Sequence, residues 1–585
     1  MEPTLAKYIA QGHGGLIVTL IGLGVLASPI MVKGQSPNWD WAVAYGCPGG
    51  EYCYDLASDH AGNIFTTGYF HGSVDFDPGP GEDVQNSQGG LGIYLLKLDG
   101  QGQHVWARSI GGPGYKFGND MALDFLGNIY LIGQFGGTID FDPGPDTVEL
   151  TSNGELDVFI AKFNGSGQLL WAKGFGGEMN DFARAIVLDE VHHALFLAGS
   201  MRGTVDFNLG TAVNELTSDS TTDVFMVKYD TSGTFNWARS ISGTGDVICG
   251  GAALNPSGNG GLIVAGRFEG TIDLDPDTSA ELHQPSNGAT DIFISAVDME
   301  GHLSWAWGIG GTQFEQVRDV ASAHSDLIAI TGSFQGTVDF DAGADSAMLT
   351  SAGANEMFVL TVNGSGAMQW ARCTAGVSDA TGMTVLTDAM ASGNVCATGY
   401  FGNTVDLNPA PGSGLFKTSA GNDDALLVCW DSTGHFLGGD ALGGFAPDYL
   451  LAATALPGGS LALGGSFFSP EMAVGQTLLV NSIDFAATGD AFIARATMPV
   501  TGISDYTTND KIVLWPNPAH HALSIRSSTN MHGAMIIIYD LCGIEVLKSD
   551  FQPTMDISSL VPGAYVLKLI PNRGEQFRSS IIIVE

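Results

Sequence analysis

The residues with the clearest chemical potential are acidic pairs that recur along the chain in one short pattern. In each pair, two side chains with carboxylate or carboxamide groups flank a phenylalanine or a leucine. Residues two apart in an extended segment share a face, so we expect both polar side chains to point one way and the apolar one to point into the core. Four pairs contain two aspartates: Asp75 and Asp77, Asp140 and Asp142, Asp273 and Asp275, and Asp339 and Asp341.

These pairs support two interpretations. Two carboxylates with nearby backbone carbonyls suit Ca²⁺, which takes roughly six to eight oxygen ligands. Alternatively, aspartate ahead of proline and glycine favours turns, and its carboxylate can accept local backbone N–H groups. Two further copies, which begin at Asp206 and Asp406, carry asparagine in the second position. A motif repeated this often is more typical of structure than of catalysis, so we favour the turn, with calcium as the alternative.

The acidic pairs belong to a long internal repeat that is marked by tryptophan. Its landmarks recur every 65 to 68 residues, and such a constant period is the signature of a repeat architecture. We interpret the tryptophans as core packing of a closing strand, with a sugar-stacking platform as the alternative where one faces the surface. The landmarks are Trp41, Trp106, Trp171, Trp237, Trp305 and Trp370, with a degenerate copy near Phe436.

Each repeat contains four strand-like segments and no helical period. In the second repeat, residues 120–124 and 129–133 form a hairpin around Gly127-Asn128, a pair that favours tight turns. Residues 157–162 and 168–173 supply the third and fourth strands. Four antiparallel strands repeated seven times predict an all-β fold, a seven-bladed β-propeller.

The two ends of the repeat region complement each other. The region opens with a closing-type strand, Trp39 to Tyr45, and ends with a third strand, Asp490 to Ala496, that no closing strand follows. Pairing the two removes exposed edges, which otherwise invite aggregation. We therefore expect residues 38–497 to form a closed ring, in which the N-terminal strand completes the last blade, rather than a linear solenoid.

The repeat resembles a known family. The pattern D-x-A-x-D-x-x-G-N-I-Y-x-x-G, followed by D-V-F-I-A-K and a closing W-A-x-x-x-G-G, is similar to the SBBP-type β-propeller repeats of secreted bacterial proteins. The resemblance covers roughly residues 38 to 497. It implies a propeller in an extracellular setting, but it implies no single activity, because the fold hosts many functions.

The last part of the chain has a different character. Residues 498–510 form a polar linker, and residues 511–585 contain short alternating strands that predict a small β-sandwich. This segment resembles the type A C-terminal sorting domain of the type IX secretion system. The resemblance implies that the type IX secretion machinery is a partner and that the protein is secreted or held on the outer cell surface. The matching motif residues are Pro516, Asn517, Pro518, Tyr539, Asp540, Gly543, Gly563 and Tyr565.

The first part of the chain predicts a signal peptide over residues 1–34. Lys7 precedes an apolar run from Leu16 to Met31 that has the length of a signal-peptide core. The run is shorter than the roughly 20 apolar residues that a membrane span needs. We expect no transmembrane segment after cleavage; an uncleaved anchor is the alternative.

Composition and isolated residues set further bounds. With 62 acidic and 22 basic residues, the net charge of −40 argues against nucleic acid and anionic membranes as partners. Cys47 and Cys53 flank a glycine-rich turn and could close a small disulfide in an oxidising compartment. His192-His193 occupies a hairpin turn, and a metal-ligand pair is the less favoured interpretation.

The chain lacks the short motifs of serine hydrolases, zinc proteases and P-loop enzymes. We therefore predict a non-catalytic binding or scaffold module for an extracellular glycan or protein, with Ca²⁺ as its one candidate cofactor. The alternative is a carbohydrate-active hydrolase or lyase with carboxylates at the centre of the ring. An enzyme should break the repeat with unique polar residues near the axis, and the apolar divergence of the seventh repeat favours the binding module.

Overall fold

A computed structural model describes most of residues 35–585. The predicted signal peptide and nearly all of the predicted linker lie outside the described residues. Across the described ranges no helical segment has the length and apolar character of a membrane span. Also outside the description are residues 219–220, 258–259, 278–280, 324–325, 344, 353, 378, 388–392, 410–413, 483–487, 499–512, 516–521, 527–534, 541–544, 553, 561–562, 571–577 and 585.

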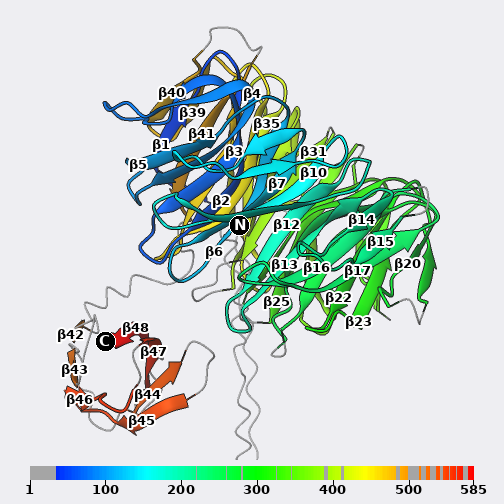
Figure 1. Cartoon of the computed structure of the whole chain (residues 1–585). Coiled ribbons are helices and arrows are strands. Elements are labelled where there is room, and N and C mark those ends of the chain that lie inside the picture. Colours follow the sequence, from blue (N-terminus) through cyan, green and yellow to red (C-terminus); the bar gives the residue numbers. More distant parts are fainter. Residues whose placement is uncertain are drawn as a thin grey trace, which may run out of the picture.

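The described strands of the repeat region form seven four-stranded antiparallel units, or blades (Figure 1). The first strands of blades one to seven are β2 (Glu51–Ser58), β6 (Lys116–Leu123), β12 (Phe182–Asp189), β18 (Val247–Leu254), β24 (Glu315–Ala323), β31 (Ala380–Thr387) and β37 (Asp448–Ala455). The second strands are β3 (Ile64–Asp75), β7 (Ile129–Phe135), β13 (Ala194–Met201), β19 (Leu262–Phe268), β25 (Leu327–Phe334), β32 (Val395–Phe401) and β38 (Ser460–Phe467).

The outer half of each blade repeats in the same way. The third strands are β4 (Val84–Leu98), β10 (Asp157–Phe163), β16 (Asp223–Asp230), β22 (Asp291–Val297), β28 (Glu356–Val362), β35 (Asp424–Trp430) and β41 (Asp490–Thr497). The fourth strands are β5 (His104–Ile110), β11 (Leu169–Phe175), β17 (Phe235–Gly243), β23 (Leu303–Ile309), β29 (Met368–Cys373), β36 (Phe436–Leu442) and, for blade seven, the N-terminal β1 (Asn38–Tyr45).

The first strands form a closed ring around the axis. Each one contacts the first strand of both neighbouring blades, and β37 of blade seven contacts β2 of blade one. The ring is held together by β1, which pairs antiparallel with β41 so that Tyr45 lies opposite Ala491. The all-β propeller predicted from the repeat is therefore confirmed, and the N-terminal strand completes the last blade.

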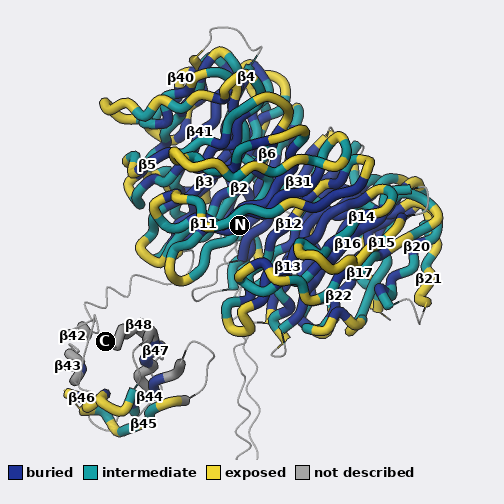
Figure 2. Tube along the Cα trace, viewed as in Figure 1, coloured by how far each residue is buried: buried dark blue, intermediate teal, exposed yellow. Residues whose placement is uncertain are grey.

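The core lies between neighbouring blades. Seven hydrophobic clusters each combine side chains from two adjacent blades. The second strands β7, β13, β25 and β38 are buried along their whole length, and Figure 2 shows such strands as dark blue. Because both faces of these strands are covered, their sequences read as nearly continuous apolar runs.

The repeated tryptophans join one blade to the next. In five blades the indole N–H donates to a carbonyl in the turn between the third and fourth strands of the following blade. The bonds run from Trp41 to Gly100 (3.3 Å), Trp106 to Gly165 (3.3 Å), Trp237 to Met299 (2.9 Å), Trp305 to Gly364 (2.9 Å) and Trp370 to Ser432 (3.1 Å). This contact explains the period of the landmark as blade packing and supports that interpretation over a surface platform.

Small hairpins extend one face of the ring. Each follows a second strand, and in blades one to six it contains an acidic pair or its Asp-x-Asn equivalent; in blade one it is the continuation of β3 and β4. The others are β8 (Thr138–Asp140) with β9 (Glu149–Thr151), β14 (Thr204–Asp206) with β15 (Glu215–Thr217), β20 (Thr271–Asp273) with β21 (His283–Pro285), β26 (Thr337–Asp339) with β27 (Met348–Thr350), β33 (Thr404–Asp406) with β34 (Phe416–Thr418), and β39 (Glu471–Val474) with β40 (Thr477–Val480); β30 (Ala375–Gly376) pairs with β33.

The predicted disulfide between Cys47 and Cys53 is wrong. Both thiols are free and buried, and the Cys47 thiol donates to Glu51 Oε1 (3.1 Å) instead. The disulfide joins Cys396 and Cys429, which lie directly opposite each other on β32 and β35. The cause is register: residues 33 apart in sequence meet across two paired strands, whereas Cys47 lies in the loop between β1 and β2 and Cys53 lies within β2.

The C-terminal segment forms two sheets, shown in orange to red in Figure 1. Of the predicted sorting motif, Tyr539 and Asp540 end β44, and Asp540 pairs with the buried Tyr565 of β47. Gly563 begins β47, whereas Pro516, Asn517, Pro518 and Gly543 lie outside the described residues. The sheets are β42 (Val513–Trp515), β43 (Ala522–Arg526) and β46 (Thr554–Asp556), and β45 (Glu545–Asp550), β44 (Met535–Asp540), β47 (Gly563–Ile570) and β48 (Arg578–Val584).

Candidate functional site

The acidic pairs predicted as metal ligands are bonded to their own loops. The first aspartate of each pair accepts two backbone N–H groups: Asp140 Oδ1 accepts those of Asp142 (3.1 Å) and Val148 (2.8 Å). The residue between the two is buried, as expected for Phe141. The same pair of bonds forms at Asp75, Asp206, Asp273, Asp339 and Asp406.

The second residue of each pair closes a tight turn. Asp142 Oδ1 accepts the N–H of Gly144 (2.7 Å), and Asp77, Asp275 and Asp341 make the equivalent bond. In blade three the neutral Asn208 makes it equally well (2.9 Å). Within the described residues no three acidic, histidine or cysteine side chains are placed to hold a metal ion. These contacts favour a turn-forming role, and calcium binding stays a prediction.

His192-His193 likewise serves a turn. His193 adopts a positive φ of 52°, the conformation that glycine supplies at the same hairpin in other blades. His192 Nδ1 lies 2.7 Å from Asp189 Oδ2 on the neighbouring strand end. The contacts satisfy the pair locally, in line with the interpretation as a turn.

Different chemistry lies along the axis. Every first strand carries a β-bulge at the same position, and all seven bulged residues line the central channel. The bulged residues are Tyr54, Asn119, Arg184, Gly250, Arg318, Met383 and Leu451, and the next residues are Asp55, Asp120, Ala185, Gly251, Asp319, Thr384 and Ala452. These bulges line a cavity of about 570 Å³, so a shared backbone feature presents residues that vary around the ring.

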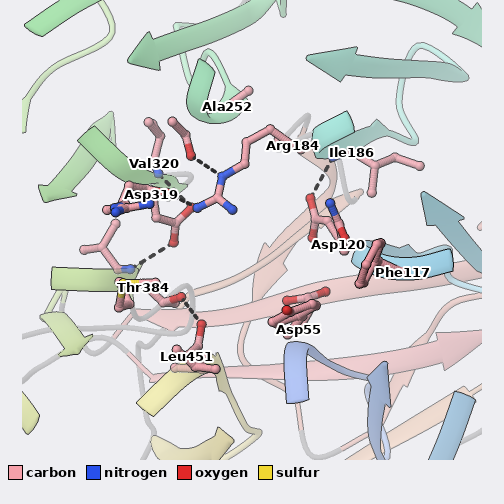
Figure 3. Close-up of a pocket in the computed structure, with 18 of the residues that line it drawn as sticks. Asp55, Phe117, Asp120, Arg184, Ile186, Ala252, Asp319, Val320, Thr384 and Leu451 are labelled. Carbon is pink, nitrogen blue, oxygen red and sulfur yellow. Dashed lines mark hydrogen bonds between the residues drawn. The ribbon is translucent and has the colours of Figure 1, made fainter. Parts of the chain in front are cut away.

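Three aspartates in this channel bridge neighbouring blades. Asp55 Oδ2 accepts the N–H of Met121 (2.9 Å), and Asp120 Oδ2 accepts that of Ile186 (2.7 Å). Asp319 Oδ2 accepts the N–H of Val385 (2.9 Å), and Figure 3 shows Arg184 extending across the cavity between Asp120 and Asp319. Each carboxylate therefore fastens its own first strand to the first strand of the following blade.

Burial shifts the protonation of these aspartates. It raises the pKa of Asp319 to about 7 and raises the pKa of Asp55. The pKa of Asp120 is raised well above its usual value, first by burial and then by the adjacent charge of Asp55. The Asp55 and Asp120 carboxyl groups also interact with each other, so a change in the charge of one shifts the pKa of the other.

Three arginines gather on one side of the channel, in blades three, four and five. They are Arg184, Arg267 and Arg318, and they line a second cavity of about 430 Å³ that shares Arg184 and Arg318 with the first. None of them forms an ion pair with a described residue. Arg184 and Arg267 donate to neutral groups, and the buried Arg318 Nε has no hydrogen-bond partner among the described residues.

Aromatic rings occupy the opposite side, in blades six, seven, one and two. Tyr52 stacks on Tyr69 with 4.9 Å between ring centroids, and Tyr69 meets Phe117 at 5.4 Å. Tyr400 meets Tyr449 at 5.0 Å, and Phe468 links Tyr449 to Tyr52. We call these rings, together with Tyr54, the aromatic arc: Phe117, Tyr54, Tyr69, Tyr52, Phe468, Tyr449 and Tyr400. All are half-buried, so their faces remain partly accessible.

The arc and the arginines lie at one end of the channel, its mouth. One position near the start of each first strand is paired with a residue near the end of the second strand. In blades one to seven the pairs are Tyr52 with Tyr69, Phe117 with Gln134, Phe182 with Ser200, Ile248 with Arg267, Gln316 with Ser333, Thr381 with Tyr400, and Tyr449 with Ser466. First strands begin where second strands end, so the mouth opens on the face that carries the acidic hairpins. One position of the repeat therefore changes from aromatic to polar and cationic around the ring.

Further buried carboxylates lie where blades meet. Four fully buried carboxylates lie at the start of their blades, and each accepts a hydrogen bond from a backbone N–H of the preceding loop. They are Glu51, Asp181, Glu315 and Asp448. Burial raises the pKa of Glu51 to about 8, of Glu315 to about 7 and of Asp181 to about 6. In blade two the corresponding residue is Lys116, whose ammonium group donates to the Leu91 (2.7 Å) and Gly112 (2.8 Å) carbonyls.

The sequence interpretation missed the channel residues. Asp55, Asp120 and Asp319 stand at the first aspartate of the repeat pattern, but the bulge that turns them toward the axis leaves no mark in composition. An alignment of the seven repeats could have pointed to these residues, because this position varies around the ring. It is Asp, Asp, Ala, Gly, Asp, Thr and Ala in blades one to seven. The axis thus does carry the broken repeat that the sequence did not reveal.

Comparison with known families agrees with the repeat and with the C-terminal sheets. Residues 105–134 match a β-propeller repeat, and residues 513–584 match a secretion system C-terminal sorting domain. The chain therefore carries a match to a β-propeller repeat within the ring and a match to a sorting domain at its C-terminal sheets. Such a domain directs its carrier out of the cell, so the protein is secreted or displayed on the outer surface.

Curated relatives match only part of the propeller. A WD repeat-containing protein of Acanthamoeba polyphaga mimivirus is 22% identical over 241 residues, which are 36% of this chain and 17% of that protein. The regulatory protein FlaEY of Caulobacter vibrioides is 23% identical over 271 residues, which are 43% of this chain and 27% of that protein. The chain thus spans at most about a quarter of the length of these relatives.

Solved structures with related architecture are distant. Sqt1 from Chaetomium thermophilum is 12% identical with a TM-score of 0.35, and the match covers 80% of this chain and 100% of that one. PorZ, a surface component of the type IX secretion system of Porphyromonas gingivalis, is 9% identical with a TM-score of 0.15 over 93% of this chain and 100% of that one. The strand pairings described above establish the fold.

Proposed function

We propose that this protein is an extracellular binding module whose ligand site is the channel mouth of the propeller. The observation that carries the proposal is the arrangement at the axis in which arginines face aromatic rings across one cavity. The cavity volumes fall within the range of about 300–1,000 Å³ that is common for small-ligand sites. The sorting domain supplies export, and the ring of blades holds the site rigid.

The bonding of the channel aspartates supports binding over catalysis. Asp55, Asp120 and Asp319 each accept a backbone N–H from the following blade, so these carboxylates already have a structural partner. A general base or a nucleophile needs a lone pair directed at the substrate. In this proposal the aspartates position the inner strands, and the arginines and rings contact the ligand.

A second candidate function is hydrolysis of a saccharide. The observations in its favour are the broken repeat at the axis and the interacting carboxyl groups of Asp55 and Asp120 at the cavity wall, since glycosidases use a pair of carboxyl groups. In that case Asp120 would donate a proton to the leaving oxygen and a second carboxylate would stabilise the developing charge.

A binding screen followed by a product assay separates the two functions. The full chain is screened on an array of neutral, carboxylated and sulfated glycans, and the positive glycans are then incubated with the protein and assayed for new reducing ends. We expect binding without products and a loss of binding in Arg318→Gln. Products that disappear in Asp120→Asn would establish the hydrolase instead, and binding that survives every change in the channel would overturn the proposed site.

A further inference from the structure

The arginines at the mouth are electrostatically unusual for this protein. The chain has 62 acidic and 22 basic residues, yet three arginines converge on one cavity and none has an acidic partner among the described residues. Burial and the nearby charge of Arg184 lower the pKa of Arg318. The nearby Asp319 offsets part of the charge of Arg184, and a bound anion would relieve the repulsion that remains among the three arginines.

The guanidinium groups also have unused donors. Arg184 commits Nε to the Gly250 carbonyl (2.8 Å) and one Nη to the Arg318 carbonyl (2.8 Å), which fixes its position. Arg267 donates to Gln316 Oε1 (3.1 Å). Because each guanidinium carries five N–H groups, several donors remain free to bind a carboxylate, and planar guanidinium groups recognise carboxylates in a bidentate manner.

The aromatic arc adds a requirement for a ring-shaped ligand. Phe117 and Tyr54 line the same cavity as Arg184 and Arg318, so a ligand there contacts rings on one side and cations on the other. The apolar C–H face of a sugar pyranose packs on an aromatic ring, whereas a free inorganic anion would make no use of it. The mouth thus favours a ligand with both a flat apolar face and a negative charge.

The surroundings of the mouth limit the charge of that ligand. The hairpins on the same face carry the acidic pairs, and the net charge of the chain is −40. A long polyanion would meet this negative field outside the mouth and be repelled, whereas a short ligand with one or two charges would fit within the arginine cluster. This condition separates a short acidic sugar from a heparin-like polymer.

We infer that the channel mouth binds a short saccharide that carries a carboxylate, of the uronic acid class. The carboxylate lies among Arg184, Arg267 and Arg318, and the sugar ring packs on Phe117 and its aromatic neighbours. This inference rests on the proposed binding function, because it names the ligand class of the same site.

Calorimetry with matched sugars tests the ligand class. The full chain is titrated with pairs of uronic acid disaccharides and their methyl esters, including digalacturonate and its ester, which differ only in charge. We expect the acid of at least one pair to bind ten times or more tightly than its ester. Acids that never bind better than their esters would overturn the inference. If a neutral glycan binds and the Phe117→Leu variant no longer binds it, the proposed binding site would stand although its ligand is uncharged.

Matched variants assign the two contacts. Arg318→Gln should weaken binding of the acid at least tenfold and leave the ester unchanged, whereas Phe117→Leu should weaken both. The controls are Arg239→Gln, which changes an outer-strand arginine stacked on Trp237, and Phe416→Leu, which changes an exposed hairpin ring. Melting temperatures verify that each variant is folded. Equal losses in Arg318→Gln and Arg239→Gln would refute a specific carboxylate site.

Discussion

The acidic hairpins and the channel mouth use polar residues in opposite ways. In blades one to six the hairpins repeat one solution, and the first aspartate of each pair accepts backbone N–H groups of its own loop. At the mouth the same positions differ from blade to blade, and a buried arginine nitrogen lacks a described partner. The most conspicuous motif of the sequence therefore builds the scaffold, while the least regular position provides the candidate site.

The comparison separates two reasons for a polar residue in a repeat protein. A residue whose partners lie in its own loop is needed once per blade, because every blade must make the same turn. A ligand-binding residue is needed once per ligand, so it has no reason to repeat. In a ring of similar blades, departure from the repeat near the axis is a better guide to function than repetition at the rim.

Removing one carboxylate from each region should have unequal effects. Asp319→Ala leaves the N–H groups of Val320 and Val385 without their acceptor inside the channel, so we expect a loss of about 1–3 kcal/mol in the free energy of unfolding. Asp140→Ala affects N–H groups that water can reach more easily, and we expect about 0.5–1 kcal/mol. Urea unfolding of both variants measures the difference, and equal losses would contradict the distinction.

The stability contributed by the buried carboxylates and that contributed by the acidic hairpins should change in opposite directions with pH. Burial raises the pKa of Glu51 to about 8 and that of Glu315 and Asp319 to about 7, above their unfolded values of roughly 4. Their protonated forms favour the fold, so this contribution to stability is complete below pH about 4 and is lost as the pH rises through 7 and 8. We expect the melting temperature to fall between pH 5 and pH 8.5.

The hairpins contribute with the opposite sign. The N–H of Ala347 lowers the pKa of Asp339, so its contribution is present above the unfolded pKa and is lost as the pH falls through the lower folded value. Asp319→Asn should therefore reduce the loss of stability on the alkaline side, and Asp339→Asn the loss on the acid side. Melting curves across the pH range provide the measurement, and a melting temperature that rises steadily from pH 5 to pH 8.5 would contradict the assignment.

Calcium should produce the smallest effect. Because the paired aspartates already accept backbone N–H groups, we expect millimolar Ca²⁺ to shift the melting temperature by no more than about 1 °C, since only binding to the folded state raises it. An increase of several degrees that Asp140→Asn together with Asp142→Asn abolishes would instead show that the hairpins are calcium sites. Mg²⁺ at the same concentration serves as the control for ionic strength.

The sequence by itself determined the propeller, the N-terminal closing strand and the sorting domain. These follow from periodicity: the tryptophan recurs because each indole reaches the next blade, and the paired aspartates recur because each hairpin needs the same turn. Local rules were sufficient for these features, because the residues involved lie in one blade or in the contact of two neighbouring blades.

Only the tertiary structure decided which side chains meet at the axis and which cysteines are joined. Arg184, Arg267 and Arg318 are far apart in sequence and converge because the ring closes and the bulges turn the first strands toward the channel. Cys396 meets Cys429 because strand register sets them opposite each other. Closure, bulges and register depend on how whole strands pair and pack, and no short stretch of sequence encodes them alone.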